Sequence, residues 1–76
     1  MEPMHEQIRQ AIAAAAAEGH KLATFHYEVL AHSAELESAD ADGFCRAVDV
    51  PASYVTEFRK MLALAKLIRE RGLSLS

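Results

Sequence analysis

The sequence predicts a small all-α domain built from four helices, of which the last is the longest. Apolar residues recur at three- and four-residue spacing through most of the 76-residue chain, which is the period of an amphipathic helix. Alanine, the strongest helix former, occupies the whole run from Ala13 to Ala17. No Asn-Gly hairpin signal and no sustained apolar–polar alternation supports a sheet. A chain of this length holds one small core, so we expect residues 1–76 to form a single domain.

The first helix is predicted over about residues 4–18. Pro3 suits its first turn, where the missing N–H of proline costs no hydrogen bond. Gly19 suits its end, because glycine adopts the left-handed conformation that closes many helices. The apolar stripe consists of Met4, Ile8, Ile12 and Ala15. This stripe is narrow, so we expect the helix to bury one face only.

The second helix is predicted over about residues 25–36. Residues 20–23 are interpreted as a connector, and Thr24 is expected to be the N-cap because its hydroxyl can accept from a free backbone N–H. A broad apolar surface is expected from Phe25, Tyr27, Val29, Leu30, Ala34 and Leu36.

Two further helices are predicted, a short one over about residues 40–48 and a long one over about 52–71. Asp40 and Asp42 precede the apolar positions of the short helix and are typical capping residues. Pro51 opens the long helix, and Gly72 ends it. The apolar residues of the long helix are Val55, Phe58, Met61, Leu62, Leu64, Ala65 and Ile68.

The charge of the chain is unevenly distributed. The formal net charge is −3, which comes from −6 over residues 1–42 and +3 over residues 43–76. An acidic chain is a poor partner for nucleic acid, but a folded domain with this distribution can still present one basic face. The alternative is that both halves are ordinary solvated helix surface.

Composition excludes several classes of protein. The single Cys45 excludes an internal disulfide. No apolar run approaches the roughly 18 residues of a membrane span, and the start Met1-Glu2-Pro3 lacks the basic residues of a signal peptide. We therefore expect a cytoplasmic protein without a membrane partner.

No catalytic or metal-binding pattern stands out, so we expect neither enzyme activity nor a cofactor. His26 and His32 are six residues apart, which places them on different sides of a helix. Glu28 and His32 are four apart, but one such pair is typical of a surface contact. Cys45 is expected to be a buried structural thiol, since no histidine lies near it in sequence.

Residues 41–60 carry the most informative pattern. A helix-turn-helix needs a short helix, a tight turn and a second helix that crosses the first at a small residue. The turn would be Val48-Asp49-Val50-Pro51, and Cys45 would be the small residue at the crossing. The apolar positions that would lock the two helices together are Phe44, Val48, Val50, Val55 and Phe58.

The stretch FCRAVDVPASYVTEFRKM resembles the helix-turn-helix of the lambda repressor/Cro-like superfamily and of related bacterial regulators. In that pattern the family usually has alanine where this chain has Cys45, and glycine where this chain has Asp49. The glycine position takes a left-handed backbone conformation, which aspartate tolerates better than most residues.

The resemblance implies a small transcription regulator, of bacterial or phage type, that docks the helix starting at Pro51 in the major groove of double-stranded DNA. Ser53 and Thr56 would donate to phosphates or bases, and Lys60 would meet phosphate or guanine. Glu57 would repel phosphate, although it could accept from cytosine. The full set of expected DNA-binding residues is Arg46, Ala52, Ser53, Tyr54, Thr56, Glu57, Arg59 and Lys60.

Two further expectations concern partners. Such a small reader is expected to act as a homodimer, because dimers read two half-sites. The interface would come from Met61, Leu64, Leu67, Ile68, Leu73 and Leu75, unless these residues close the core of one chain instead. The alternative function is a protein-protein interaction adaptor or antagonist that uses the same scaffold without binding DNA.

Overall fold

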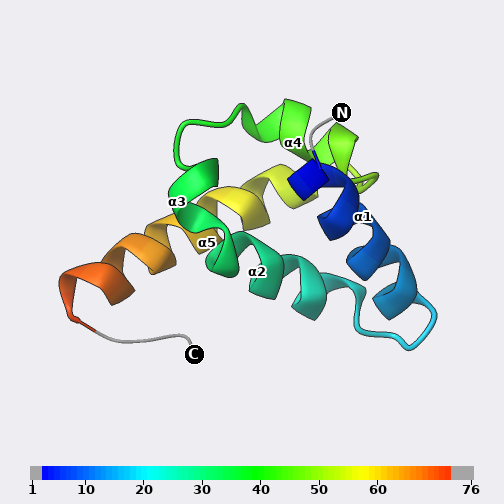
Figure 1. Cartoon of the computed structure of the whole chain (residues 1–76), viewed down its shortest axis with the longest axis horizontal. Helices are drawn as coiled ribbons and strands as arrows, with labels where there is room; N and C mark the ends of the chain where they lie inside the picture. The colour runs from blue at the N-terminus through cyan, green and yellow to red at the C-terminus, as the bar shows by residue number, and fades with distance from the viewer. Residues whose placement is uncertain (1–2, 73–76) are drawn as a thin grey trace.

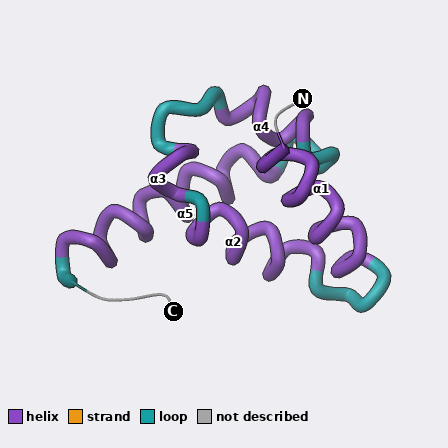
Figure 2. The backbone as a smooth tube through the Cα atoms, in the orientation of Figure 1, coloured by secondary structure: helices purple, strands orange, loops and turns teal. Residues whose placement is uncertain are grey.

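The computed structural model describes residues 3–72. This part of the chain forms five helices and no strand, so the predicted all-α class is confirmed. The helices are α1 (Pro3–Ala16), α2 (Lys21–Ala31), α3 (Ser33–Leu36), α4 (Ala41–Ala47) and α5 (Tyr54–Glu70) (Figure 1). Short loops join them (Figure 2). Helix α2 packs on both α1 and α5, and α4 packs on the same two helices.

The core lies where α1, α2, α4 and α5 meet. The three phenylalanines of the chain form its centre: the ring centroid of Phe44 lies 6.2 Å from that of Phe25 and 5.0 Å from that of Phe58. Tilted aromatic pairs at these separations stabilise a core beyond the area that they bury. The other core residues are Ile8, Ile12, Val29, Leu36, Cys45, Val48 and Val50.

Helix α1 ends as the sequence predicts, by a turn at Gly19. Gly19 has a φ of +79°, its N–H donates to the Ala16 carbonyl at 3.2 Å, and the His20 N–H donates to the Ala15 carbonyl at 2.9 Å. This pair of bonds is the Schellman motif, which satisfies carbonyls left free at a helix end.

The second helix differs from its prediction in two respects. It begins at Lys21 rather than at residue 25, with His20 as the N-cap, so residues 21–23 are helical and Thr24 is not the cap. The Schellman turn is the physical reason for this early start. It leaves the backbone carbonyl of His20 free to accept from the Thr24 N–H at 2.9 Å, so a new helix begins at once. The helix is also interrupted at His32 (φ −106°, ψ 19°), and residues 33–36 form the separate helix α3.

Helices α4 and α5 agree with the prediction within a few residues. Asp40 is the N-cap of α4, and its carboxylate accepts from the Gly43 N–H at 2.8 Å. Helix α5 starts at Tyr54 rather than at residue 52, because residues 52 and 53 form a turn ahead of it. The last turns of α5 extend past the rest of the domain (Figure 1).

The connection between α4 and α5 is a second Schellman turn. Asp49 has a φ of +59°, its N–H donates to the Arg46 carbonyl at 3.2 Å, and the Val50 N–H donates to the Cys45 carbonyl at 3.0 Å. The left-handed conformation expected at Asp49 is therefore confirmed. This turn directs α5 across α4 and completes a helix-turn-helix.

Candidate nucleic-acid interface

The packing positions of the helix-turn-helix are filled as the sequence predicts. Cys45 is buried in the core cluster, and Phe44, Val48, Val50 and Phe58 are buried with it. Val55 is partly buried against the same cluster. Burial raises the pKa of the Cys45 thiol, and the negative charge of Asp42 adds to the shift. A neutral buried thiol is a packing group rather than a nucleophile.

Several of the expected DNA-binding residues share the exposed side of α5. Thr56, Arg59 and Lys60 are exposed, and spacings of three and four residues place them on one face of a helix. Ala52 and Ser53 are exposed in the turn just before this helix. Arg46 is exposed in the last turn of α4. The structure thus brings small, hydroxyl-bearing and basic side chains to the start of α5.

Tyr54 does not belong to that exposed face. Its ring is half-buried and lies 5.0 Å, centroid to centroid, from the ring of Phe25 in an edge-on arrangement. The Lys21 ammonium lies 5.8 Å from the centre of the same ring. Tyr54 therefore anchors the start of α5 to α2, which is a packing role rather than a groove-facing one.

Glu57 also points toward the protein. Its Oε1 atom lies 2.8 Å from Nε2 of His26 on α2, and its Oε2 atom lies 3.4 Å from Nζ of Lys60. The hydrogen bond with His26, together with the nearby Lys60 charge, holds the pKa of Glu57 below its ordinary value of 4.5. The Glu57 carboxylate, which was expected to lie close to phosphate, thus makes its contacts within the protein.

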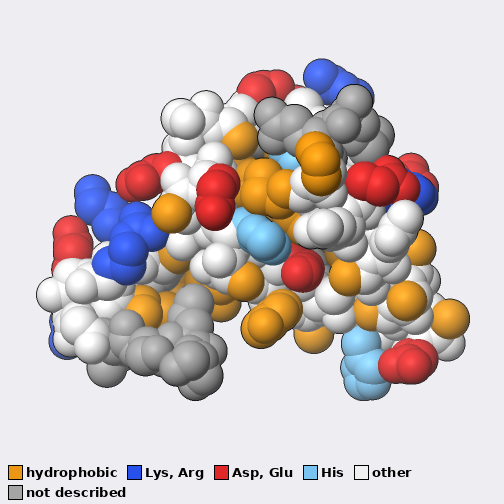
Figure 3. Space-filling model, viewed as in Figure 1, with side chains coloured by type: hydrophobic (Ala, Val, Ile, Leu, Met, Phe, Trp, Pro, Cys, Tyr) orange, Lys and Arg blue, Asp and Glu red, His pale blue; other side chains and the backbone are white. Residues whose placement is uncertain are grey.

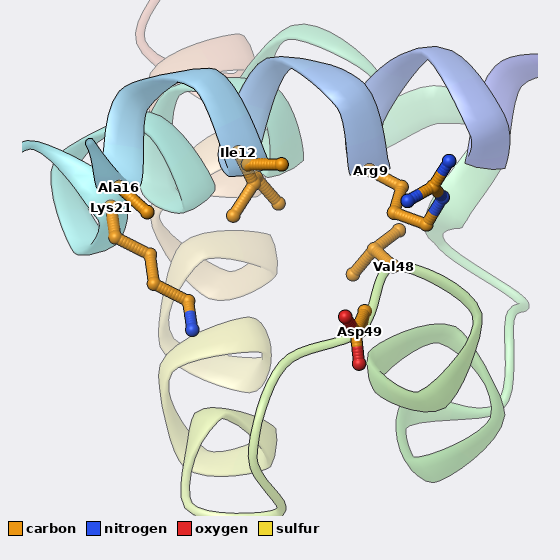
Figure 4. A pocket seen from close by; sticks show the side chains of 7 residues that line it. Arg9, Ile12, Ala16, Lys21, Val48 and Asp49 are labelled. Carbon is orange, nitrogen blue, oxygen red and sulfur yellow. The ribbon is translucent and has the colours of Figure 1, made fainter.

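Asp49, in the turn of the motif, faces α1. It lines a cavity between α1 and the turn (Figure 4). Arg9 lines the same cavity; its pKa is raised by its hydrogen bond to Glu6 and, to a smaller extent, by the charge of Asp49. The first three turns of α5 present Arg59 and Lys60 as exposed cations, and the carboxylate beside Lys60, that of Glu57, is partly buried and hydrogen-bonded to His26.

The remaining charges of α5 lie away from this start. Lysine and arginine side chains gather over the far end of the helix, at the left of Figure 3, where acidic side chains are interspersed with them. Among them, the Arg69 guanidinium donates to Ser33 Oγ at 3.1 Å and to Glu37 Oε1 at 3.4 Å. Arg69 therefore ties α3 to α5.

Sequence patterns missed two side chains near the candidate interface, His26 and Lys21. His26 orients Glu57 from 31 residues away, and Lys21 covers the ring of Tyr54. Both precede the helix-turn-helix pattern in the chain, and local spacing carries no signal for contacts at such separation.

Residues 3–72 hold neither a metal-binding cluster nor a membrane-spanning helix. No three His, Cys, Asp or Glu side chains of this part of the chain are grouped so that they could hold a metal ion. No helix formed by these residues is both long and apolar enough to span a bilayer.

Comparison with known proteins gives one match. A family model described as an HTH-like domain matches residues 2–71, which is nearly the whole chain. No curated protein and no solved structure matches the sequence.

Proposed function

Because this chain belongs to the HTH-like domain family, we propose that it is a small DNA-binding transcription regulator of bacterial or phage type. The observation that carries this proposal is the exposed face of α5, where Thr56, Arg59 and Lys60 lie together while Glu57 is held by His26. The resemblance of residues 41–60 to the lambda repressor/Cro-like superfamily supports the same function.

In the proposed complex, the first turns of α5 lie in the major groove of double-stranded DNA. Ala52 allows the backbone to approach the duplex, and the hydroxyls of Ser53 and Thr56 donate to phosphates or base edges. Arg59 and Lys60 contact phosphate or the acceptor atoms of guanine. Arg46, in the last turn of α4, adds a contact to the phosphate backbone of the DNA.

The protein is proposed to bind as a homodimer. Leu64 and Leu67 lie in the second half of α5, and 39% and 45% of their surfaces are exposed. Both side chains are available to a second copy, whereas Met61 and Ile68 are half-buried in the same chain. Leu73 and Leu75, which were also expected at this interface, lie outside the described residues. Two copies would present two α5 helices to successive half-sites, about 34–36 Å apart on DNA.

The DNA-binding proposal is tested by titrating the protein into a fluorescently labelled random duplex at low and moderate salt. Binding should weaken steeply as salt rises, because each neutralised phosphate contributes about −0.9 to the slope of log K against log salt. Replacing Arg59 or Lys60 by Gln should weaken binding roughly 5- to 150-fold, which corresponds to about 1–3 kcal/mol per contact.

Arg71→Gln is the matched control. It removes the same charge from an exposed position at the far end of α5, about 16 Å along the helix from Lys60 at 1.5 Å per residue. Affinity of this variant should stay near that of the unmodified protein. Absence of binding at low salt, or equal losses in all three variants, would overturn the proposal.

A second candidate function is a protein-interaction adaptor or antagonist that enters no groove. The observation that favours it is the exposed apolar surface of α2, where Leu22 and Tyr27 are 41% and 64% exposed. These residues lie outside the helix-turn-helix, and aromatic groups are enriched in protein interfaces. Unchanged DNA affinity in Arg59→Gln and Lys60→Gln would favour this function.

A further inference from the structure

A cavity of about 250 Å³ lies between α1 and the turn of the helix-turn-helix (Figure 4). Three elements that are distant in sequence form it: α1, the start of α2 and the residues that follow α4. The side chains that line it include Arg9, Ile12, Ala16, Lys21, Val48 and Asp49. None of these residues belongs to the proposed DNA-contacting face.

The floor of the cavity is apolar. Ile12 and Val48 are core residues of α1 and of the turn, and the methyl group of Ala16 continues this surface toward α2. Aliphatic groups on both sides offer favourable contact to an aliphatic ligand.

The rim carries opposite charges at its two sides. Lys21 approaches from the start of α2 and Asp49 from the turn (Figure 4). Within residues 3–72, neither the Lys21 ammonium nor the Asp49 carboxylate has an ion-pair partner within 4.0 Å. Arg9, by contrast, already donates to the Glu6 carboxylate through two nitrogens. The cavity thus offers, beside an apolar floor, a cation and an anion that make no ion pair with the described residues, while the Arg9 cation nearby is paired with Glu6 and the Lys21 ammonium lies 5.8 Å from the centre of the Tyr54 ring.

We propose that this cavity binds a small zwitterion with an aliphatic body, namely a free amino acid. Its carboxylate pairs with Lys21, its ammonium group pairs with Asp49, and its aliphatic part lies on Ile12 and Val48. The size agrees with this class, because the volume is below the range of about 300–1,000 Å³ that is typical of drug-sized ligands. Binding at this cavity does not depend on whether α5 binds DNA.

The bound amino acid would contact the residue that sets the direction of α5. Asp49 is the left-handed residue of the Schellman turn, and its N–H donates to the Arg46 carbonyl. The backbone amides of residues 48–50 are therefore sensitive reporters of an occupied cavity.

The proposal is tested by recording ¹⁵N–¹H spectra of the DNA-free protein during titration with leucine. The mono-charged analogues are isocaproate, which lacks the ammonium group, and isopentylamine, which lacks the carboxylate. Leucine should shift the amide signals of residues 48–50 and of Lys21 saturably. Its dissociation constant should be at least about tenfold lower than that of either analogue, since each analogue leaves one rim charge unpaired. γ-Aminobutyrate, whose charges are farther apart, distinguishes an ω-amino acid site from an α-amino acid site.

Two variants locate the binding at the rim. Asp49→Asn keeps the side-chain shape and the tolerance for a left-handed backbone, and Lys21→Gln keeps a helix-forming residue at the start of α2. Each should weaken binding of the zwitterion about tenfold or more, while Lys66→Gln, an exposed position outside the cavity, should leave it unchanged. The same spectra report whether each variant is folded.

Three results would overturn the proposal. The first is no saturable shift with either leucine or γ-aminobutyrate up to about 10 mM, well above the 1 mM scale of weak specific binding. The second is equal binding of the mono-charged analogues. The third is unchanged binding in folded Asp49→Asn and Lys21→Gln. Because no DNA is present, none of these results bears on the DNA-binding proposal.

Discussion

At the scale of single residues, Asp49 shows how a substitution at a strained position can be tolerated. It takes the left-handed conformation (φ +59°) that glycine adopts without steric cost. A short polar side chain is one of the few alternatives that can occupy this region. The whole direction of α5 depends on this one backbone angle, because the turn bonds of Asp49 and Val50 close α4.

Replacing Asp49 by Ala should therefore destabilise the domain, whereas replacing it by Asn should be nearly neutral. Both variants remove the carboxylate, so the difference between them isolates the backbone conformation. We expect Asp49→Ala to lower the free energy of unfolding by about 1–2 kcal/mol relative to Asp49→Asn. Urea denaturation followed by circular dichroism measures this difference, and equal stabilities would show that the turn is not strained.

The pair of His26 and Glu57 predicts a dependence of stability on pH. The pKa of Glu57 is lowered in the folded protein, mainly by its hydrogen bond with His26. A lowered folded-state pKa contributes stability above the unfolded pKa, near 4.5 for a glutamate, and this contribution is lost as pH falls through the folded value. Part of the acid destabilisation should therefore come from this contact.

Glu57→Gln should show a smaller loss of stability between pH 6 and pH 3 than the unmodified protein, measured as the urea midpoint at each pH. Glu18→Gln is the matched control, since Glu18 is exposed and makes no ion pair with the described residues. If the urea midpoint of Glu57→Gln fell between pH 6 and pH 3 by as much as that of the control, the stabilising role of the pair would be contradicted.

At the scale of elements, one aromatic residue joins most of the helices. Phe44 on α4 packs on Phe25 of α2 and Phe58 of α5, and its ring also meets that of His5 on α1 at 5.5 Å. Phe44 thus connects α4 to three other helices. A helix as short as α4 has little stability of its own, so it depends on this packing.

Phe44→Ala should consequently cost about 3–5 kcal/mol, the range for removing a buried phenylalanine. A domain of this size has a total stability of only about 5–10 kcal/mol, so we expect a large drop in the thermal midpoint or loss of cooperative unfolding. Thermal unfolding followed by circular dichroism tests this, with Tyr27→Ala as the exposed aromatic control. A midpoint within a few degrees of the control would refute the central role of Phe44.

At the scale of the whole molecule, the acidic and the basic part of the chain form largely different helices. The acidic part of the chain, up to residue 42, contains α1, α2, α3 and the first two residues of α4, while the basic remainder contains the rest of α4, the turn and α5. The net charge of −3 is compatible with the proposed DNA partner because the one carboxylate in the first turns of α5, that of Glu57, is held by His26, and Asp49 lies in the turn beside α1.

The proposed dimer is tested at this same scale. Leu67→Glu places a charge in the exposed apolar surface of α5 without entering the core of one chain. We expect the unmodified protein to sediment as a dimer at micromolar concentration and Leu67→Glu as a monomer with the same helical content. A control variant, Glu18→Gln, should remain dimeric. A strictly monomeric unmodified protein would contradict the dimer.

The sequence by itself determined those features that depend on neighbours in the chain. It predicted the all-α class, a helix stop at Gly19 and capping residues that include Asp40, because these arise from helical period and local hydrogen bonds. The left-handed Asp49 was expected from the resemblance of residues 41–60 to the helix-turn-helix pattern. The packing positions around Cys45 were predictable for the same reason, since they recur at fixed spacing from the turn.

Only the tertiary structure decided which side of α5 faces solvent. The inward placement of Tyr54 and Glu57 depends on Phe25 and His26, and the cavity beside Asp49 depends on α1. The start of α2 at Lys21 also differed from the prediction, because a closing turn and a new helix overlapped at His20. The physical reason is common to these cases: a periodic pattern shows that a helix has a buried face, whereas the identity of the groups that meet this face is set by contacts between distant parts of the chain.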